Sequence, residues 1–474
     1  MDTRTTLIDG VWTALERRRE VTSPGTGEVV GSVCWGTADD ARRAADAAAA
    51  AFESWAGMPG RARADILLRA ADLLAERRDG IARMLAAEAG KRLPEAVGEL
   101  TFSAEYVRWF AEEVRRPQGS VYAQEDPARR HLSIRSAAGV VVSLTSWNFP
   151  CSLQARKLAP ALAAGCPVVV RASERAPLAV TEMIRAFTDA GVPAGVLGLV
   201  HGPSREITDA LLEHPAVRVV TFTGSTAVGR AIMAKAAERV VRPMLELGGD
   251  AGFVVFDDAD VDEAVEAALL AKTRNTGQSC VAANRFIVHE DVHDEFVAKL
   301  AARLDALTIG DGLADPVPDL GPMIDAKGVL AVNEIVADAL ARGAHEATAP
   351  REVPSGGTFA KPALFTHVPD DARMAREEVF GPVAGVFPFR TEDEAIARAN
   401  GTEMGLAAYV FSKDASRCWR VAERLQAGIV GINDPLPSVA FAPMGGVKQS
   451  GLGREGSTIG LEEFTEPKYL AWRL

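Results

Sequence analysis

Several features are missing from this chain, and each absence excludes a class of protein. No stretch offers the roughly 20 uninterrupted apolar residues that a membrane-spanning helix needs. The opening residues, MDTRTTLIDGVW, contain no basic start followed by an apolar segment, so neither secretion nor import into an organelle is expected. The sequence therefore predicts a cytoplasmic protein that has no membrane partner.

Cysteines and basic clusters are also scarce. The chain has only five cysteines, which are scattered along a long sequence. Their number is odd, so they cannot all pair, and reduced thiols are favoured over a disulfide framework. The net charge is -12, and basic residues gather only in short runs such as Arg17 to Arg19. Nucleic acid is therefore not the expected partner. We also expect no bound metal.

The residues that are present indicate an α/β fold with more than one domain. A chain of 474 residues exceeds what a single hydrophobic core usually organises. Alanine-rich segments with helical spacing alternate with short valine-rich runs, as is typical of a mostly parallel sheet covered by helices.

Two early helices are expected at residues 41–55 and 61–78, with Pro59-Gly60 between them and Gly80 closing the second. Strands and helices then alternate. The expected strands begin near Gly139, Cys166 and Arg218, and the expected helices are 152–164, closed by Gly165, and one from about 227.

A second alternating region begins at Gly252-FVVFDDAD and continues past Phe380-GPVAGVFPF. This change indicates a second α/β domain whose boundary lies close to the ELGG segment that starts at Glu246. Ligand sites often form between domains, so the boundary is a candidate site.

The segment TFTGSTAVGR places Gly224, Ser225 and Gly229 where an apolar strand turns into a helix. Glycine lets a ligand approach the backbone closely, and the N-terminus of a helix attracts a phosphate group. Strand-glycine-helix turns without a ligand are common, however, so this segment alone leaves both interpretations open.

Three further residues have side chains suited to catalysis. Cys280 follows a polar turn and precedes an apolar run, which can expose a thiol, although free cysteines are often buried and structural. Glu246 can act as a base if burial raises its pKa, or it can be an ordinary surface or capping residue. Asn148 can project from a strand end as an oxyanion donor, or it can stabilise a turn.

Six motifs in one order change the balance between these alternatives: TSWNFP, FTGSTAVGR, ELGG, GQSC, EEVFGP and GGVKQSGLGREG. Together they resemble the aldehyde dehydrogenase superfamily over nearly the whole chain, and they are most similar to its succinate-semialdehyde dehydrogenase branch. The resemblance implies a Rossmann-like NAD(P)-binding domain at 1–120 and 140–246 and an α/β catalytic domain at 247–440. It also implies a small β oligomerisation element at 121–139 and 455–474, and hence a homodimer or homotetramer.

The resemblance also implies catalytic roles. Cys280 would be the nucleophile, Asn148 would share the oxyanion hole with the Cys280 backbone N–H, and Glu246 would activate water for hydrolysis of a thioester. Glu455 matches an acidic position of the family and is a candidate proton relay, or else an exposed loop glutamate.

The cofactor residues follow from the same motif match. The resemblance places a dinucleotide across Trp147, Gly224, Ser225 and Gly229, with Glu378 and Phe380 near the nicotinamide ribose. Glu174 would bind the adenosine ribose and repel a 2′-phosphate, which favours NAD. Arg171 stands where the family usually has lysine, and its guanidinium could bind that phosphate, so NADP stays open.

The expected substrate is a small aldehyde with an anionic tail. In the branch that this chain resembles, two arginines and a serine hold the substrate carboxylate, and Arg156, Arg285 and Ser438 are the matching candidates. Structural ion pairs are the alternative role for both arginines. Ala282 stands where many branch members have a second cysteine, so a disulfide switch with the nucleophile is not expected.

Other functions remain as alternatives. Met444 replaces the usual phenylalanine, and prolines stiffen the loop that carries Ser438, so a sulfonated, phosphonated or neutral aldehyde is an alternative substrate. A CoA-acylating enzyme usually lacks the glutamate that is present here as Glu246. A cysteine hydrolase would need a histidine base, and no recognisable triad signature accompanies the seven histidines.

Overall fold

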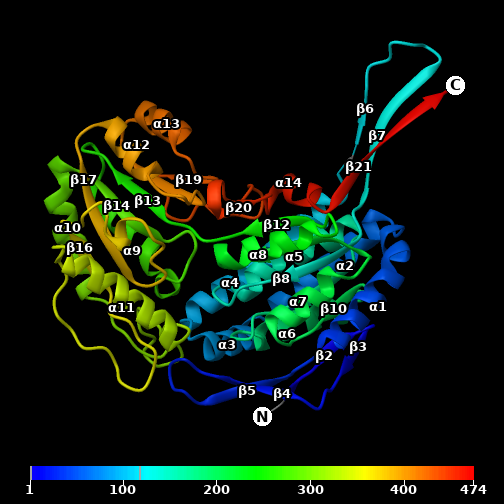
Figure 1. Ribbon diagram of the computed structural model, residues 1–474, viewed down its shortest axis with the longest axis horizontal. Helices are drawn as coiled ribbons and strands as arrows, with labels where there is room; N and C mark the ends of the chain where they lie inside the picture. Colours follow the sequence, from blue (N-terminus) through cyan, green and yellow to red (C-terminus); the bar gives the residue numbers. More distant parts are fainter. Residues whose placement is uncertain (1–2, 117–118) are drawn as a thin grey trace.

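The computed structural model describes residues 3–116 and 119–474. Two α/β regions lie side by side, and a narrow arm projects away from both (Figure 1). The first region is built on an eight-stranded sheet and the second on a seven-stranded sheet. The α/β fold predicted from the sequence is confirmed.

The first sheet has the strand order β20-β12-β11-β8-β9-β10-β2-β3. Its central strands are parallel, whereas β2, β3 and β20 join antiparallel at the edges. The bounds of its strands are β2 Thr6–Ile8, β3 Val11–Thr13, β8 Val140–Leu144, β9 Val168–Arg171, β10 Leu197–Leu199, β11 Val217–Thr223, β12 Arg242–Glu246 and β20 Gly451–Leu452.

Helices cover both faces of this sheet, because its central strands are apolar on both sides. In β8, Val141 packs in one core cluster with α2 to α6, whereas Val140 and Val142 pack in another with α1, α7 and α8. The helices are α1 Ala38–Ala56, α2 Gly60–Glu76, α3 Arg78–Ala89, α4 Leu93–Glu113, α5 Pro150–Ala164, α6 Leu178–Asp189, α7 Ser204–Leu212 and α8 Thr226–Ala237. A three-stranded sheet of β1 Thr3–Arg4, β4 Arg18–Thr22 and β5 Val29–Cys34 lies beside α6.

The early helices match the expectation except at one end. The second expected helix stops at Glu76, and Gly80 lies inside the next helix, α3, instead of closing α2. A glycine ends a helix when it takes the left-handed conformation. Gly90, with φ of 71°, does so at the end of α3.

The second sheet has the order β15-β16-β17-β14-β13-β18-β19 and is parallel except at β15. Its strands are β13 Ala251–Val255, β14 Ala283–His289, β15 His345–Glu346, β16 Ala363–Thr366, β17 Val383–Phe389, β18 Ala407–Phe411 and β19 Ile429–Ile432. The helical segments of this region are α9 Val261–Thr273, η1 Arg274–Gly277, α10 Glu290–Asp305, α11 Ala326–Ala341, η2 Arg373–Ala375, α12 Glu392–Asn400 and α13 Ala415–Arg424.

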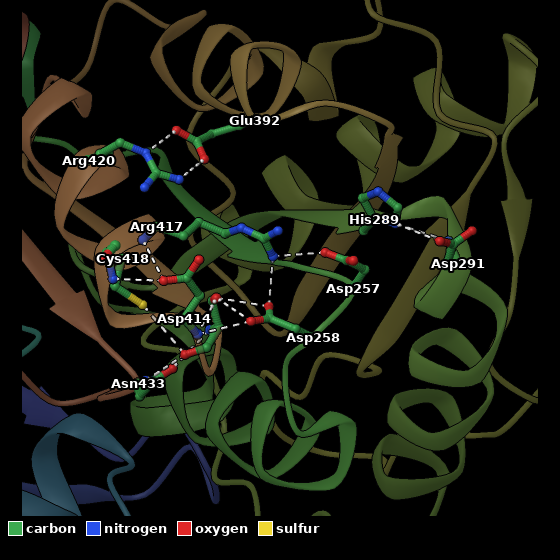
Figure 2. Close-up of polar contacts among 12 residues, drawn as sticks. Asp257, Asp258, His289, Asp291, Glu392, Asp414, Arg417, Cys418, Arg420 and Asn433 are labelled. Carbon is green, nitrogen blue, oxygen red and sulfur yellow. Dashed lines mark hydrogen bonds and ion pairs between the residues drawn. The ribbon is translucent and has the colours of Figure 1, made fainter.

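Acidic residues fix the carboxyl edge of this second sheet (Figure 2). Asp414 caps α13 by accepting the backbone N–H groups of Ser416 and Arg417. The Arg417 side chain returns to Asp257 and Asp258, which follow β13, at 2.8 Å each. These contacts join β13 to α13 at the edge of the sheet that lies away from the site described below.

The projecting arm is a three-stranded antiparallel sheet of order β21-β7-β6 (Figure 1). Its strands are β6 Gly119–Val121, β7 Arg129–Ala137 and β21 Thr465–Arg473, and β21 is reached through η3 Lys448–Ser450 and α14 Ser457–Glu462. The two segments expected to form a β element, 121–139 and 455–474, thus contain strands that pair with each other, with Thr465 opposite Ala137 and Arg473 opposite Arg129.

Among the helices of residues 3–116 and 119–474, none combines the length and the apolar character that crossing a bilayer requires. Within the same residues, His, Cys, Asp and Glu side chains form no group of three that could hold a metal ion.

Candidate active site

The candidate site lies where the carboxyl edge of the first sheet meets the amino edge of the second. Asn148, Glu174 and Gly224 follow β8, β9 and β11, and Glu246 is the last residue of β12. On the other side, Cys280 lies just before β14. Ligands of open α/β sheets usually bind at the carboxyl ends of the strands, so this cleft is in the expected place.

The loop that carries Cys280 packs directly against the ELGG segment. Asn275 and Thr276 have positive φ values of 52° and 58°, so the chain turns sharply after α9 before it reaches Cys280. A side chain at Gly249 would overlap the carbonyl oxygen of Cys280. The second glycine of ELGG is therefore required for this close approach.

The surroundings of Cys280 disfavour its thiolate form. Burial raises the pKa of the thiol to about 12, and the nearby carboxylates of Glu246 and Glu378 raise it further, whereas Arg156 lowers it. Because only the thiolate is strongly nucleophilic, the reactivity of Cys280 depends on the charges that face it.

Glu246 is a buried carboxylate with raised proton affinity. Burial, followed by the charge of Glu455, raises its pKa to about 8, while Lys157 and Arg156 lower it. Its Oε1 atom has no hydrogen-bond partner within residues 3–116 and 119–474. A carboxylate that titrates near neutral pH and keeps an acceptor free has the properties of a general base.

Asn148 sits in the turn between β8 and α5, and its side chain faces the nucleophile loop. Its Nδ2 atom donates to the carbonyl oxygen of Gln278, two residues before Cys280, at 3.2 Å. The backbone carbonyl oxygen of Asn148 accepts hydrogen bonds from Lys91 Nζ at 2.8 Å and from Asn275 Nδ2 at 3.0 Å. Asn148 as a whole residue is only 4% exposed, so its orientation is set by the protein and not by water.

Glu455 is buried and not an exposed loop residue. It is hydrogen-bonded to Lys157 of α5, and Arg156 lies 3.9 Å from its other oxygen. The negative charge of Glu455 also raises the pKa of Glu246, so the two carboxylates lie close together. The structure therefore brings Glu455 into the same charge cluster as Glu246.

Arg156 and Ser438 are also brought together. Arg156 Nη2 donates to Ser438 Oγ at 2.9 Å, and Nη1 contacts the sulfur of Met444. The guanidinium lies over the ring of Tyr106, 5.0 Å from its centroid, so its flat face is covered. Its Nε atom has no hydrogen-bond partner in the described part of the chain.

Arg285 is not part of this group, and the expectation that it would join Arg156 and Ser438 is corrected. It forms an ion pair with Asp250 at 2.9 Å and donates to the carbonyl oxygens of Asp250, Arg398 and Ala399. Because Arg285 lies inside β14, its side chain contacts Asp250, just before the neighbouring strand β13, and the end of α12.

Arg274 was missed by the sequence analysis, although it stands six residues before Cys280. Its guanidinium lies over the ring of Phe149, 4.9 Å from the centroid, beside the turn of Asn148. Burial lowers its pKa, and the positive charge of Arg156 lowers it further. Its position in the RNTGQSC motif, directly before the nucleophile turn, is the signal that could have identified it.

A cleft of about 220 Å³ connects Cys280 to the strand-helix turn of the first sheet. Trp147 and Phe380 face each other edge to face across it, with centroids 5.7 Å apart. Glu378 accepts the backbone N–H of Gly249 at 2.9 Å. The residues that line the cleft are Ser146, Trp147, Asn148, Thr223, Gly224, Ser225, Leu247, Gly248, Cys280, Glu378 and Phe380.

The turn from β11 into α8 has the geometry of an anion site. Ser225 is the N-cap of α8, and Gly224 leaves space that a side chain could fill only by displacing the ring of Phe222. Gly229 does not line the cleft. It lies one turn into α8, where a side chain would overlap Leu247, so this position needs glycine for the packing of α8.

A larger pocket of about 900 Å³ continues from this turn between α7 and α8. Arg171 lies at its wall, donates to Ser204 Oγ, and leaves its buried Nε without a partner among the described residues. Glu174 forms an ion pair with Arg19 at 3.1 Å. The size of the pocket, the free N-terminus of α8 and the unpartnered Nε fit a nucleotide that extends from the cleft.

The comparisons with known proteins agree with this geometry. Residues 12–470 match the model of the aldehyde dehydrogenase family. The chain is 44% identical to a glutarate-semialdehyde dehydrogenase of Pseudomonas aeruginosa, over 98% of this chain and 96% of that protein.

It is 43% identical, with the same two coverages, to the NADP(+) succinate-semialdehyde dehydrogenase of Escherichia coli and to a 3-sulfolactaldehyde dehydrogenase of Pseudomonas putida. The crystal structure of succinate-semialdehyde dehydrogenase from Burkholderia pseudomallei is similar at 45% identity with a TM-score of 0.97. The matched region covers 99% of this chain and 98% of the Burkholderia pseudomallei chain.

Removing the charge of Glu246 should make Cys280 more reactive. Because the Glu246 carboxylate raises the pKa of the thiol, Glu246→Gln should speed alkylation of Cys280 by iodoacetamide, on the order of tenfold for each pKa unit recovered. Glu246 has a pKa of about 8, so the difference should vanish near pH 6 and grow as the pH rises past 8.

Alkylation rates measured from pH 6 to pH 9 would test this, with Cys280→Ser correcting for the other cysteines. Slower alkylation of the Glu246→Gln variant would show instead that Glu246 takes the proton of the thiol.

Proposed function

The chain belongs to the aldehyde dehydrogenase family, and we propose that it oxidises a short aldehyde with an anionic tail to the corresponding acid through a thioester on Cys280. The observation that carries this proposal is the pair of arginines beside the nucleophile. Arg156 is buried and donates a hydrogen bond to Ser438. Arg274 lies over the ring of Phe149, close enough to Arg156 that the Arg156 charge lowers the pKa of Arg274.

In the first step, the Cys280 sulfur forms a bond to the aldehyde carbon, and the thiol proton leaves to water in the cleft. The carbonyl oxygen becomes an oxyanion, and the Asn148 amide and the Cys280 backbone N–H are the donors that we assign to it. A bound nicotinamide dinucleotide supplies the acceptor for the hydride that then leaves this carbon.

In the second step, Glu246 takes a proton from water as the water oxygen bonds to the thioester carbon. The carbon–sulfur bond breaks, and the sulfur takes the remaining proton of the acid, which releases the carboxylate and restores the Cys280 thiol. We assign to Glu455 and Lys157 the passage of the proton away from Glu246, because both lie in one buried charge cluster with it.

The dinucleotide would be held by the first α/β region, and the nucleophile is carried by the second. Trp147, Ser225, Glu378 and Phe380 line the cleft, and Arg171 lines the larger pocket. We therefore assign the region built on the eight-stranded sheet to cofactor binding and the region built on the seven-stranded sheet to catalysis.

A carboxylate is the tail that we favour. Two guanidinium groups can bind both of its oxygens through paired hydrogen bonds and so direct the aldehyde toward Cys280. Succinate semialdehyde is therefore the first substrate to test, and a sulfonated or neutral aldehyde is the alternative.

Replacing either arginine should change the choice of substrate more than the chemistry. Arg156→Met and Arg274→Met should each lower kcat/KM for succinate semialdehyde by about 10²-fold, the order expected for a charged hydrogen bond. The value for butanal, which has the same length and no charge, should change little in Arg274→Met. In Arg156→Met it should fall by less than the value for succinate semialdehyde, because the Arg156 charge also lowers the pKa of the Cys280 thiol. Formation of reduced nicotinamide gives both numbers, and Cys280→Ala is the inactive reference.

Arg285→Met is the matched control, because it removes a buried guanidinium that is bonded to Asp250 instead. It should lower stability without changing the ratio between the two aldehydes. An unchanged ratio in both Arg156→Met and Arg274→Met would refute the anionic-tail proposal, and a changed ratio in Arg285→Met would restore the original assignment.

We propose NAD as the preferred cofactor, with NADP as a weaker second. The Glu174 carboxylate at the end of β9 would repel a 2′-phosphate, but Arg19 partly neutralises it. Glu174→Gln should therefore raise the NADP to NAD ratio of kcat/KM about tenfold, or about 1.4 kcal/mol. Arg19→Gln should lower the same ratio, and equal ratios in the two variants would contradict the assignment.

We also propose that the arm pairs with a second copy of the chain. Its outer strands, β6 and β21, offer unpaired edges, and Trp472 and Tyr469 are 63% and 59% exposed. Such edges usually have a defined partner. Sedimentation should show a dimer or tetramer, and Trp472→Asp should shift it toward the monomer; a monomeric parent chain would disprove the proposal.

A further inference from the structure

A buried ion pair lies behind the active-site turn and has no part in the reaction described above. Lys91, just before α4, is hydrogen-bonded to Glu99 within α4, and both side chains are 0% exposed. Taking two charges out of water costs free energy that their attraction repays only in part. A fully buried pair is therefore weak evidence of a stabilising role, and its other contacts indicate what it does.

Each partner uses its remaining hydrogen bonds on the turn that carries Asn148. Lys91 Nζ donates to the Asn148 carbonyl oxygen at 2.8 Å and lies 4.0 Å from the centroid of the Phe149 ring. Glu99 Oε1 accepts the backbone N–H groups of Cys151 and Ser152 at 2.9 and 3.2 Å. The ion pair thus fixes the backbone immediately before and after Phe149-Pro150.

The same helix also holds the nucleophile loop. Glu95, in the first turn of α4, accepts the backbone N–H of Asn275 at 3.0 Å. Asn275 in turn donates to the carbonyl oxygen of Asn148, which therefore accepts from both Lys91 and Asn275. One end of α4 sets the distance between the turn of Asn148 and the loop of Cys280.

We propose that Lys91 and Glu99 are positioning residues for the oxyanion hole, which orient the Asn148 amide by holding its backbone from behind. The inference rests on the proposed role of Asn148. It implies that the ion pair affects the step in which the oxyanion forms, and that it leaves the intrinsic reactivity of the thiol unchanged.

The test is the single-turnover rate of nicotinamide reduction with saturating succinate semialdehyde. Lys91→Met should lower this rate by about 10²-fold, the cost of a misplacement of about 1 Å at a reacting centre. Alkylation of Cys280 by iodoacetamide, which forms no oxyanion, should keep its rate. In an Asn148→Ala background, Lys91→Met should cause no further loss, because the group that it positions is gone.

Glu99→Gln serves as a second variant of the pair, since it keeps the shape and one acceptor oxygen and should slow the same step less. Glu88→Gln is the matched control. Glu88 is 1% exposed and accepts the backbone N–H groups of Leu178 and Ala179 at the start of α6, away from Asn148. It should lower the thermal midpoint as Glu99→Gln does, but leave the single-turnover rate unchanged.

The inference is overturned if the losses of Lys91→Met and Asn148→Ala multiply, if alkylation slows as much as turnover, or if Glu88→Gln slows turnover as much as Glu99→Gln. An Asn148→Ala variant with the parent rate would instead remove the proposed role of Asn148, and the positioning role with it. The two failures are therefore distinguishable.

Discussion

The contact between the ELGG backbone and the carbonyl group of Cys280 is the constraint on which the rest of the site depends. The two α/β regions meet edge to edge, and a side chain at Gly249 would separate them at the nucleophile. With the backbones in contact, Glu246 at the end of one sheet faces Cys280 at the start of the other. In the proposed mechanism, each sheet therefore supplies one of these two groups.

Charge is the second organising factor, because the groups at this junction set one another's proton affinity. Glu246, Glu455, Lys157 and Arg156 form a nearly neutral buried cluster, yet burial still raises the pKa of Glu246 to about 8. Burial also raises the pKa of the Cys280 thiol. Because the thiolate is the reactive form, the charges at this junction decide how nucleophilic Cys280 is.

The sequence predicted the regular elements well, because apolar periodicity and the glycines at chain turns act locally. The helix closed by Gly165 and the turn at Gly224 both occur where the pattern placed them. Gly80 was misjudged because composition does not reveal φ. Arg285 was misplaced and Arg274 missed because the direction of a side chain depends on packing. Arg285 lies within a strand beside Asp250, and Arg274 lies between the end of α9 and the kink at Asn275.

The buried position of Glu455 has a consequence for synthesis. Its partner Lys157 lies 298 residues earlier in the chain, and β20 and β21 also come from the last thirty residues. During translation most of the first sheet is made long before these segments. Until then, Lys157 lacks Glu455 and the edge of β12 lacks β20. The charge cluster can close only after the segment that carries Glu455 has been made, so its assembly is a late event in synthesis.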